Sequence, residues 1–242
     1  MSELKNVSVK RFYKQVALAE GKGGFAITLD GREAKTVGRH PLATQSRALA
    51  EALVVEWDAQ QDEIDLAAMP LTRLQGFVLD GGESARGEWQ STILSYAGSD
   101  LLCYRADDPP LAKRQADLWQ PPLDAMAERL CHAFAVTEGV IAVEQPAALL
   151  SGFEGALAQE TLPAVLSLKL MTEMLGSAVL ALCVRHHVLS TEDAFAAARL
   201  DETYQAEKWG VDAEAAARDA SVRAELEQVA RFMALSFGTS GE

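Results

Sequence analysis

The chain has 242 residues, 49% of them apolar, which is enough for a sizeable core in one large domain or two modest ones. Its formal net charge of -13 at pH 7 argues against nucleic acid or an anionic membrane surface as partner, because both bind through basic patches. The charge is uneven: residues 1–40 hold eight Lys/Arg and four Asp/Glu, a sum of +4 that leaves -17 for the rest. The sequence therefore predicts an acidic face in its second part.

The cysteines, the first residues and the longest apolar stretch indicate in which cellular compartment the protein works. The three cysteines, Cys103, Cys131 and Cys183, are odd in number and form no C-x-x-C pair, which is typical of a reducing compartment. The start "MSELKNVSVKRFYK" has the features of neither a signal peptide nor a transit peptide. A bilayer span needs roughly 20 apolar residues, whereas the best stretch, "MLGSAVLALCV", has eleven. We expect a soluble cytoplasmic protein without membrane insertion.

The first forty residues are predicted to form a small β unit. The runs "RFYKQVALAE" and "FAITLDGREAKTV" have strand composition, and Asp30-Gly31 between β-rich runs predicts a tight hairpin turn, because both residues tolerate positive φ. After Pro41 the period changes to that of a helix, with apolar residues at Leu42, Leu49, Leu53 and Trp57. Residues 1–60 are therefore assigned to a β-rich N-terminal domain with a following helix.

Residues 61–242 are predicted to form a larger, mainly helical domain, so that the fold class is α+β. Helices are expected at "MPLTRLQGFVLD" and "EWQSTILSYAGSD", followed by a helix interrupted at Pro121-Pro122, since proline cannot donate to the helical ladder. One long apolar helix is expected from Pro163 to His187 and another from Thr191 to Trp209, which Gly210 ends. A last helix is expected from Asp212 to about Phe237.

Signatures of catalysis and of metal binding are weak. "EGKGGF" lacks the Walker pattern, and Ala26 stands where the dinucleotide pattern needs its third glycine, so a hairpin turn is the simpler interpretation. Cys183, His186 and His187 share a helix end, but no second Cys/His pair lies nearby to complete four ligands. The patterns G-x-S-x-G and H-E-x-x-H are absent. We expect no enzyme activity, no metal and no cofactor.

The stretch "DETYQAEKWG", residues 201–210, leaves two interpretations open. On a helix through residues 191–209, one side carries the core stripe Ala194, Ala197, Leu200 and Tyr204. Asp201, Gln205 and Trp209 follow along its flank. The tryptophan either folds back to cap the core, or belongs to a contact surface, since Trp and Tyr supply much of the binding energy at interfaces. Composition alone does not decide between these two interpretations.

Seven phrases together resemble one family. In chain order they are "RFYKQV", "GFAITLDGREAKT", "EWDAQ", "MPLTRL", "DLLCYRA", "QADLWQPPLD" and "YQAEKWG", and they span about residue 10 to residue 214. The chain is thereby similar to the assembly chaperones that bind the alpha subunit of the F-type ATP synthase catalytic head, found in mitochondria and α-proteobacteria. The resemblance implies a small β-rich part, a mainly helical part and a function without catalysis.

The resemblance also implies a client and a mode of action. The newly made alpha subunit exposes an apolar surface that the beta subunit later covers, and the chaperone shields this surface and leaves as beta docks. We expect the helical domain to present the client-binding residues Asp201, Glu202, Gln205, Glu207 and Trp209. Structural roles are expected for Asp30 and Gly31 in the hairpin, for Gly210 at the helix end, and for Asp100 and Arg105 as an internal pair joining the domains.

Two alternatives remain open at this point. The first is an enzyme with a small-molecule pocket between the β unit and the helices, with Asp201 or Glu173 as base. It would need a nearby electrophile, metal or phosphate cradle, and the sequence shows none. The second is an adaptor that binds a client other than the alpha subunit.

Overall fold

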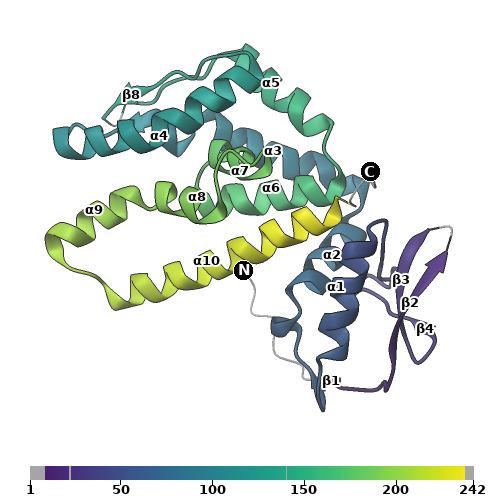
Figure 1. The fold of residues 1–242 in the computed structure, drawn as a ribbon. Coiled ribbons are helices and arrows are strands. Elements are labelled where there is room, and N and C mark those ends of the chain that lie inside the picture. The colour runs from purple at the N-terminus through teal and green to yellow at the C-terminus, as the bar shows by residue number, and fades with distance from the viewer. Residues whose placement is uncertain (1–8, 22, 140, 238–242) are drawn as a thin grey trace. The chain divides into compact units, whose positions relative to one another are not determined.

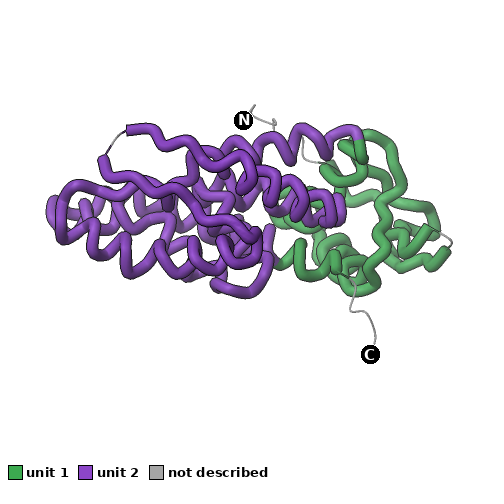
Figure 2. Tube along the Cα trace, turned by 90° about the horizontal axis from the view of Figure 1, so that it is seen from above, with its two compact units in different colours: residues 1–83, 231–242 green, residues 84–230 purple. Residues whose placement is uncertain are grey.

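The computed structural model describes residues 9–21, 23–139 and 141–237, and Figure 1 shows their fold. The chain divides into two compact units, coloured separately in Figure 2. Among the described residues, unit 1 comprises 9–83 with 231–237, and unit 2 comprises 84–230. Each unit has its own buried core, so the two are described in turn.

Unit 1 is built on a small antiparallel sheet. Strand β2 (Val16–Gly21) pairs with β3 (Gly24–Leu29), which also pairs with β4 (Arg32–Glu33) and β5 (Ala43–Thr44). Asp30 and Gly31 form the two-residue turn between β3 and β4, with φ of 50° and 78°. This is the positive-φ geometry that a tight hairpin needs, and Gly31 adopts it without a Cβ clash. A second pair joins β1 (Val9–Lys10) to β6 (Glu63–Ile64).

Two helices complete the core of unit 1. Helix α1 (Arg47–Asp58) begins at the N-cap Ser46, whose hydroxyl accepts from Leu49 N, and it buries an apolar stripe that includes Leu53 and Trp57. Helix α2 (Pro70–Gly81) follows the 3-10 turn η1 (Leu66–Ala68). Its first N–H groups have no intrahelical acceptors, and the Glu56 carboxylate accepts from two of them, at 2.8 Å each. Helix α1 thus caps helix α2 through a side chain.

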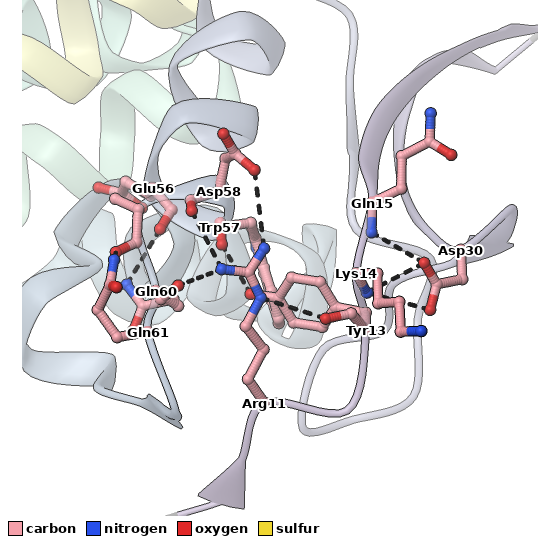
Figure 3. A network of polar contacts seen from close by, with 11 residues as sticks. Arg11, Tyr13, Lys14, Gln15, Asp30, Glu56, Trp57, Asp58, Gln60 and Gln61 are labelled. Atoms are coloured by element: carbon pink, nitrogen blue, oxygen red, sulfur yellow. Dashed lines mark hydrogen bonds and ion pairs between the residues drawn. The ribbon is translucent and has the colours of Figure 1, made fainter.

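The segment before the sheet is tied to the end of α1, as Figure 3 shows. The Arg11 guanidinium donates to the carbonyl oxygens of Tyr13 and Gln60 and lies 3.7 Å from the Asp58 carboxylate. A cation is stabilised there because the carbonyl end of a helix is electronegative. The Tyr13 hydroxyl donates to the Trp57 carbonyl at 2.7 Å.

Unit 2 is a helical bundle. Helix α6 packs against α3 and α7, and α4 packs against α5, α7 and α9. A short parallel pair joins β7 (Tyr104–Arg105) to β8 (Thr137–Glu138), and the 3-10 turns are η2 (Glu83–Ala85), at the boundary of the units in the chain, and η3 (Leu101–Cys103). The helices are α3 (Arg86–Gly98), α4 (Pro109–Leu130), α5 (Ala147–Ala158), α6 (Leu162–Leu175), α7 (Ala178–Arg185), α8 (Thr191–Ala198), α9 (Leu200–Trp209) and α10 (Ala213–Ser236), of which residues 231–236 belong to unit 1.

The expected interruption at Pro121-Pro122 is wrong, because α4 continues through both prolines. The missing N–H of each proline costs helical hydrogen bonds, but neighbouring burial compensates. Pro122 is itself buried in the helix, beside the fully buried Trp119 and Leu123. The Trp119 indole also donates to the Ala197 carbonyl at 2.8 Å, which fixes this turn of α4 against α8.

Two helices expected to be continuous are broken. The run from Pro163 to His187 divides at Gly176, which has φ of 67° and ends α6, and Ser177 then caps α7. The run from Thr191 to Trp209 divides at Arg199, whose side chain donates to the Asp219 carboxylate at 3.0 Å and to the Met174 carbonyl. The α+β class, with an N-terminal β-rich part and a mainly helical remainder, is confirmed.

Candidate functional site

Helix α9 carries the five expected client-binding residues, and the structure separates them onto different faces. At 100° per residue, positions 201, 204 and 208 share one side, 203 and 207 a second, and 202, 205 and 209 a third. The first side faces α4, the second lines a groove, and the third is exposed. The five expected residues therefore lie on one helix but in three different environments.

The side toward α4 is held by polar contacts. The Gln115 side chain, itself 1% exposed, donates to the Asp201 carboxylate at 2.8 Å. The Tyr204 hydroxyl donates to Asp108 at 2.6 Å, and this bond holds the pKa of the Asp108 carboxyl below its usual value. Lys208 lies 3.4 Å from the same carboxylate. Asp201 therefore fixes the position of α9, whatever else it contacts.

Glu207 lies at the edge of a groove of about 760 Å³ between α4, α8, α9 and α10. The groove has apolar walls, from Phe195 and Leu118 on one side and small alanines of α10 on the other. Charged residues at its edge are paired across the groove, Arg114 with Glu207 at 2.8 Å and Arg199 with Asp219 at 3.0 Å. The lining residues are Arg114, Leu118, Phe195, Ala196, Arg199, Leu200, Thr203, Glu207, Ala216, Asp219, Ala220, Arg223, Ala224 and Glu227.

The third side of α9 is a free surface, called here the α9 free face, made of Glu202, Gln205 and Trp209. All three side chains are exposed, and Trp209 is 78% exposed. Trp209 therefore does not cap the core. Val211, two residues further and 74% exposed, extends the apolar end of this face.

Gly210 ends α9 with φ of 94° and ψ of 163°, a backbone conformation that is essentially restricted to glycine. Its N–H still donates to the Ala206 carbonyl, so the helix is complete up to Trp209 before the chain turns toward α10. The glycine thus leaves the tryptophan on the last turn, where no following turn covers it.

The expected pair between Asp100 and Arg105 is replaced by separate contacts inside unit 2. The fully buried Asp100 carboxylate accepts from the Ser177 hydroxyl at 2.7 Å and from Val179 N at 3.1 Å, and so joins η3 to the start of α7. Arg105 donates to the Gln115 carbonyl at 2.9 Å and to the Gln120 side chain. Both residues organise the bundle, and Arg105 supports the Gln115 that holds Asp201.

The residues considered for other chemistry have ordinary structural surroundings. Glu173, one of the two candidate bases, forms an ion pair with Lys169 one turn away on α6, at 2.7 Å. Burial raises the pKa of Cys183 to about 12, so its thiol keeps its proton at neutral pH. In the described ranges, no group of three or more His, Cys, Asp or Glu side chains is placed to hold a metal ion. None of the helices in those ranges has both the length and the apolarity needed to cross a bilayer.

Comparison with known proteins identifies the family. The family described as ATP12 chaperone protein matches residues 10–127. The crystal structure of Atp12 from Paracoccus denitrificans matches with a TM-score of 0.90 and 36% identity, over 94% of this chain and 98% of that one. The chain belongs to the ATP12 chaperone family. The resemblance read from the seven phrases is thus confirmed, and with it a chaperone role in ATP synthase assembly.

Two further solved structures agree with this family. A variant of the Paracoccus Atp12 in which an aspartate is replaced by lysine matches with a TM-score of 0.90 and 35% identity, over 94% of this chain and 97% of that one. The Atu1473 protein of Agrobacterium tumefaciens matches with a TM-score of 0.88 and 40% identity, over 94% and 86% of the two chains. An ATP12 chaperone can therefore carry an acid-to-lysine change and keep this fold.

Several features of the site were not found by sequence reasoning. The groove beside α9 depends on how α10 packs on the bundle, and no local sequence pattern predicts that packing. Gln115 was noted only as part of a matching phrase, although it anchors Asp201. Val211 gave no signal of its exposure, because an apolar residue directly after a helix-ending glycine often packs back on the preceding helix.

Proposed function

We propose that the protein binds the unassembled alpha subunit of the F-type ATP synthase, shields its apolar beta-facing surface and releases it to the beta subunit. The observation that supports this proposal is the α9 free face: a tryptophan 78% exposed at a helix end, beside an acid and an amide. A large aromatic side chain held in water has unused apolar surface, and interfaces concentrate their energy in such residues. The acids around it then select the partner and its orientation.

The five expected residues divide into two roles in this proposal. Glu202, Gln205 and Trp209 contact the client, because their side chains are exposed. Asp201 and Glu207 position α9, because they are bonded to Gln115 and Arg114. A single exposed tryptophan gives an affinity that the larger alpha–beta interface exceeds, which is what a chaperone that hands over its client needs.

The test is aggregation of the isolated alpha subunit diluted from denaturant, followed by light scattering with and without an equimolar amount of the protein. Suppressed scattering, and transfer of alpha to added beta subunit on a sizing column, is the expected result. Full aggregation with no complex on the column would overturn the client assignment. Suppression that persists after beta is added, without transfer, would instead indicate an adaptor that holds its client.

Single-residue variants test whether the α9 free face is the surface that binds the alpha subunit. Trp209→Ala should weaken alpha binding by about 2 kcal/mol, the loss typical of a central aromatic at an interface. Its control is Ile141→Ala, which also trims an apolar side chain, 73% exposed, in unit 2. Glu202→Lys is compared with Glu154→Lys on α5, another exposed acid. Asp201 is left unchanged in this experiment, since its substitution also breaks the bond to Gln115. Equal protection by all four variants would refute the face.

A further inference from the structure

The loop of residues 35–40 in unit 1, between β4 and β5, is held in one conformation by its own hydrogen bonds. An isolated bridge between Lys35 and Pro41 closes its base. Inside it, Thr36 N donates to the His40 carbonyl at 2.9 Å and Arg39 N donates to the Thr36 carbonyl at 3.0 Å. The His40 N–H donates to the Thr36 hydroxyl oxygen at 3.1 Å. The exposed loop is therefore ordered without any partner.

Asp80, in the last turn of α2, holds the loop in place through its carboxylate. Its carboxylate accepts from the Thr36 hydroxyl, from Gly38 N at 2.9 Å and from the His40 ring at 3.0 Å. Burial tends to raise the pKa of Asp80, but the bonds from Thr36, His40 and Gly38 together lower it below its usual value. An acid at the carbonyl end of a helix is electrostatically unfavourable, so this aspartate is stabilised there by the loop.

The loop conformation also depends on its backbone. A Cβ atom at Gly38 would lie 2.6 Å from the Asp80 carboxylate, and Arg39 adopts φ of 67°, an uncommon value for a residue with a side chain. Positive φ also occurs at Asp30 in the hairpin turn and at Cys131 at the end of α4, so Arg39 alone does not mark a site. Together with the contacts of Asp80 it determines which side chains the loop exposes.

The fixed loop presents an apolar tip between two cations. Val37 is 96% exposed, and the side chains of Lys35 and Arg39 are exposed beside it. None of the ion pairs that join described residues includes Lys35 or Arg39. Lys14 and Arg129 are also exposed and belong to none of these ion pairs, so the loop is distinguished by two cations that flank an exposed apolar residue. The Asp80 carboxylate contacts Thr36, Gly38 and His40, and the side chains of Lys35 and Arg39 are left to carry positive charge at the surface.

We propose that the 35–40 loop is a second contact surface, separate from the α9 free face, that binds an acidic segment bearing an apolar side chain on the client. The inference rests on the proposed function, since the client is taken to be the alpha subunit. Lys35 and Arg39 pair with the acids of that segment while Val37 packs on its apolar residue. Charges arranged around an apolar contact set orientation and speed association.

The same residues do not fit a free phosphate or another small anion. Anion sites use unpaired backbone N–H groups, but those of Gly38, Arg39 and His40 already donate within the loop or to Asp80. The Thr36 hydroxyl is also engaged. The exposed valine would have no contact in a complex with a small anion, whereas a protein segment covers it.

The experiment titrates the protein with isolated alpha subunit at low and high salt. Lys35→Glu combined with Arg39→Glu should weaken binding about tenfold at low ionic strength, and the difference from wild type should shrink as salt screens the charges. The control combines Lys14→Glu with Arg129→Glu, which changes the net charge equally at exposed positions elsewhere. Val37→Asp tests the apolar tip, and Gly38→Ala alters the loop conformation without changing its charge.

The outcomes distinguish this inference from the proposed function. Weakened binding by the loop variants, with the control unchanged, supports the second surface. The second surface is overturned if the Lys35→Glu, Arg39→Glu variant and the Val37→Asp variant both bind like the control and keep the wild-type salt dependence while Trp209→Ala is impaired. That result leaves the α9 free face intact. Absence of alpha binding by the wild-type protein overturns the proposed function and this inference together. The combined Lys35→Glu, Arg39→Glu variant still tests the second surface if Gly38→Ala does not fold, because the side chains of both cations are exposed.

Discussion

Asp100 allows a quantitative test of how unit 2 is held together. Its carboxyl group is fully buried, and it accepts from the Ser177 hydroxyl, Val179 N and Leu102 N at 2.7 to 3.1 Å. Burial raises the pKa of Asp100 from 3.8 to about 6, because the lost hydration of the charged form outweighs these hydrogen bonds. The folded protein therefore binds this proton more tightly than the unfolded chain does.

The sign of the pH dependence follows from that difference. A raised carboxyl pKa favours folding while the group is protonated, and the favourable contribution is lost as pH rises from 3.8 through about 6. A shift of about two pKa units corresponds to about 3 kcal/mol over the whole titration. The part that falls between pH 5 and pH 7.5 is about 1 kcal/mol.

The perturbation is Asp100→Asn, which keeps the size of the side chain and removes its titration. Urea unfolding followed by tryptophan fluorescence gives the free energy of unfolding of each protein at pH 5 and at pH 7.5. The wild-type value minus the variant value should fall by about 1 kcal/mol over this interval. Asp107→Asn, at an exposed position, serves as the control.

A particular result would refute this reasoning. The wild-type free energy of unfolding minus that of Asp100→Asn would then stay constant or grow with pH. Such a result would mean that the three donors stabilise the carboxylate more than burial destabilises it. The pKa of Asp100 would then lie at or below its usual value. Subtracting the variant at each pH removes the titration of all other groups, so the comparison isolates this carboxyl.

Three further changes test individual contacts. Glu56→Ala should lower the free energy of unfolding by about 2 kcal/mol, because two N–H groups at the start of α2 lose their acceptor. Urea unfolding measures this loss beside the control Glu51→Ala, at an exposed position, and equal losses in the two variants would contradict the prediction. Gly210→Ala should cost about 1 to 3 kcal/mol, since a side chain is strained at φ of 94°; an unchanged melting temperature would show that the turn rearranges freely. Trp209→Ala should change stability by no more than about 0.5 kcal/mol, because the side chain is 78% exposed; a larger loss in the same melt would mean that the tryptophan packs on the protein.

The parts of the fold that sequence predicted are those that local chemistry decides. Asp30 and Gly31 form the hairpin turn because few other residues adopt positive φ at low cost. The last helix, expected from Asp212 to about Phe237, is observed as Ala213–Ser236. In both cases the signal lies within a few residues of the feature it predicts.

Features that depend on distant contacts were missed. The break at Arg199 has no proline or glycine, and it is accompanied by contacts of the side chain with Asp219 and with the end of α6. The prolines of α4 were expected to interrupt a helix, but the burial of Pro122 beside Trp119 outweighs the missing hydrogen bonds. Local propensity is a weak prior, and tertiary packing overrides it at these positions.

The orientation of Trp209 could not be predicted for the same reason. Helical spacing placed it with Asp201 and Gln205, but which side of α9 is covered depends on contacts from another helix. Asp108 and Gln115 of the segment around α4 bond to Tyr204 and Asp201, and this rotates the helix so that position 209 faces solvent. Sequence therefore indicated the helix that carries the site, and only the structure indicates which of its residues are free.

The phrases that identified the family mostly record folding contacts. In "RFYKQV" and "EWDAQ", Arg11 and Tyr13 bond to the end of α1 while Glu56 caps α2. In "QADLWQPPLD", Gln115 and Trp119 hold α4 against α9 and α8. Such residues are constrained whatever the client, so a match to them establishes the scaffold and does not locate the binding surface. The side chains of the α9 free face and of Val37, at the tip of the 35–40 loop, are exposed and form no bond to another described residue. They have no such structural role, so variants at these positions separate client binding from folding.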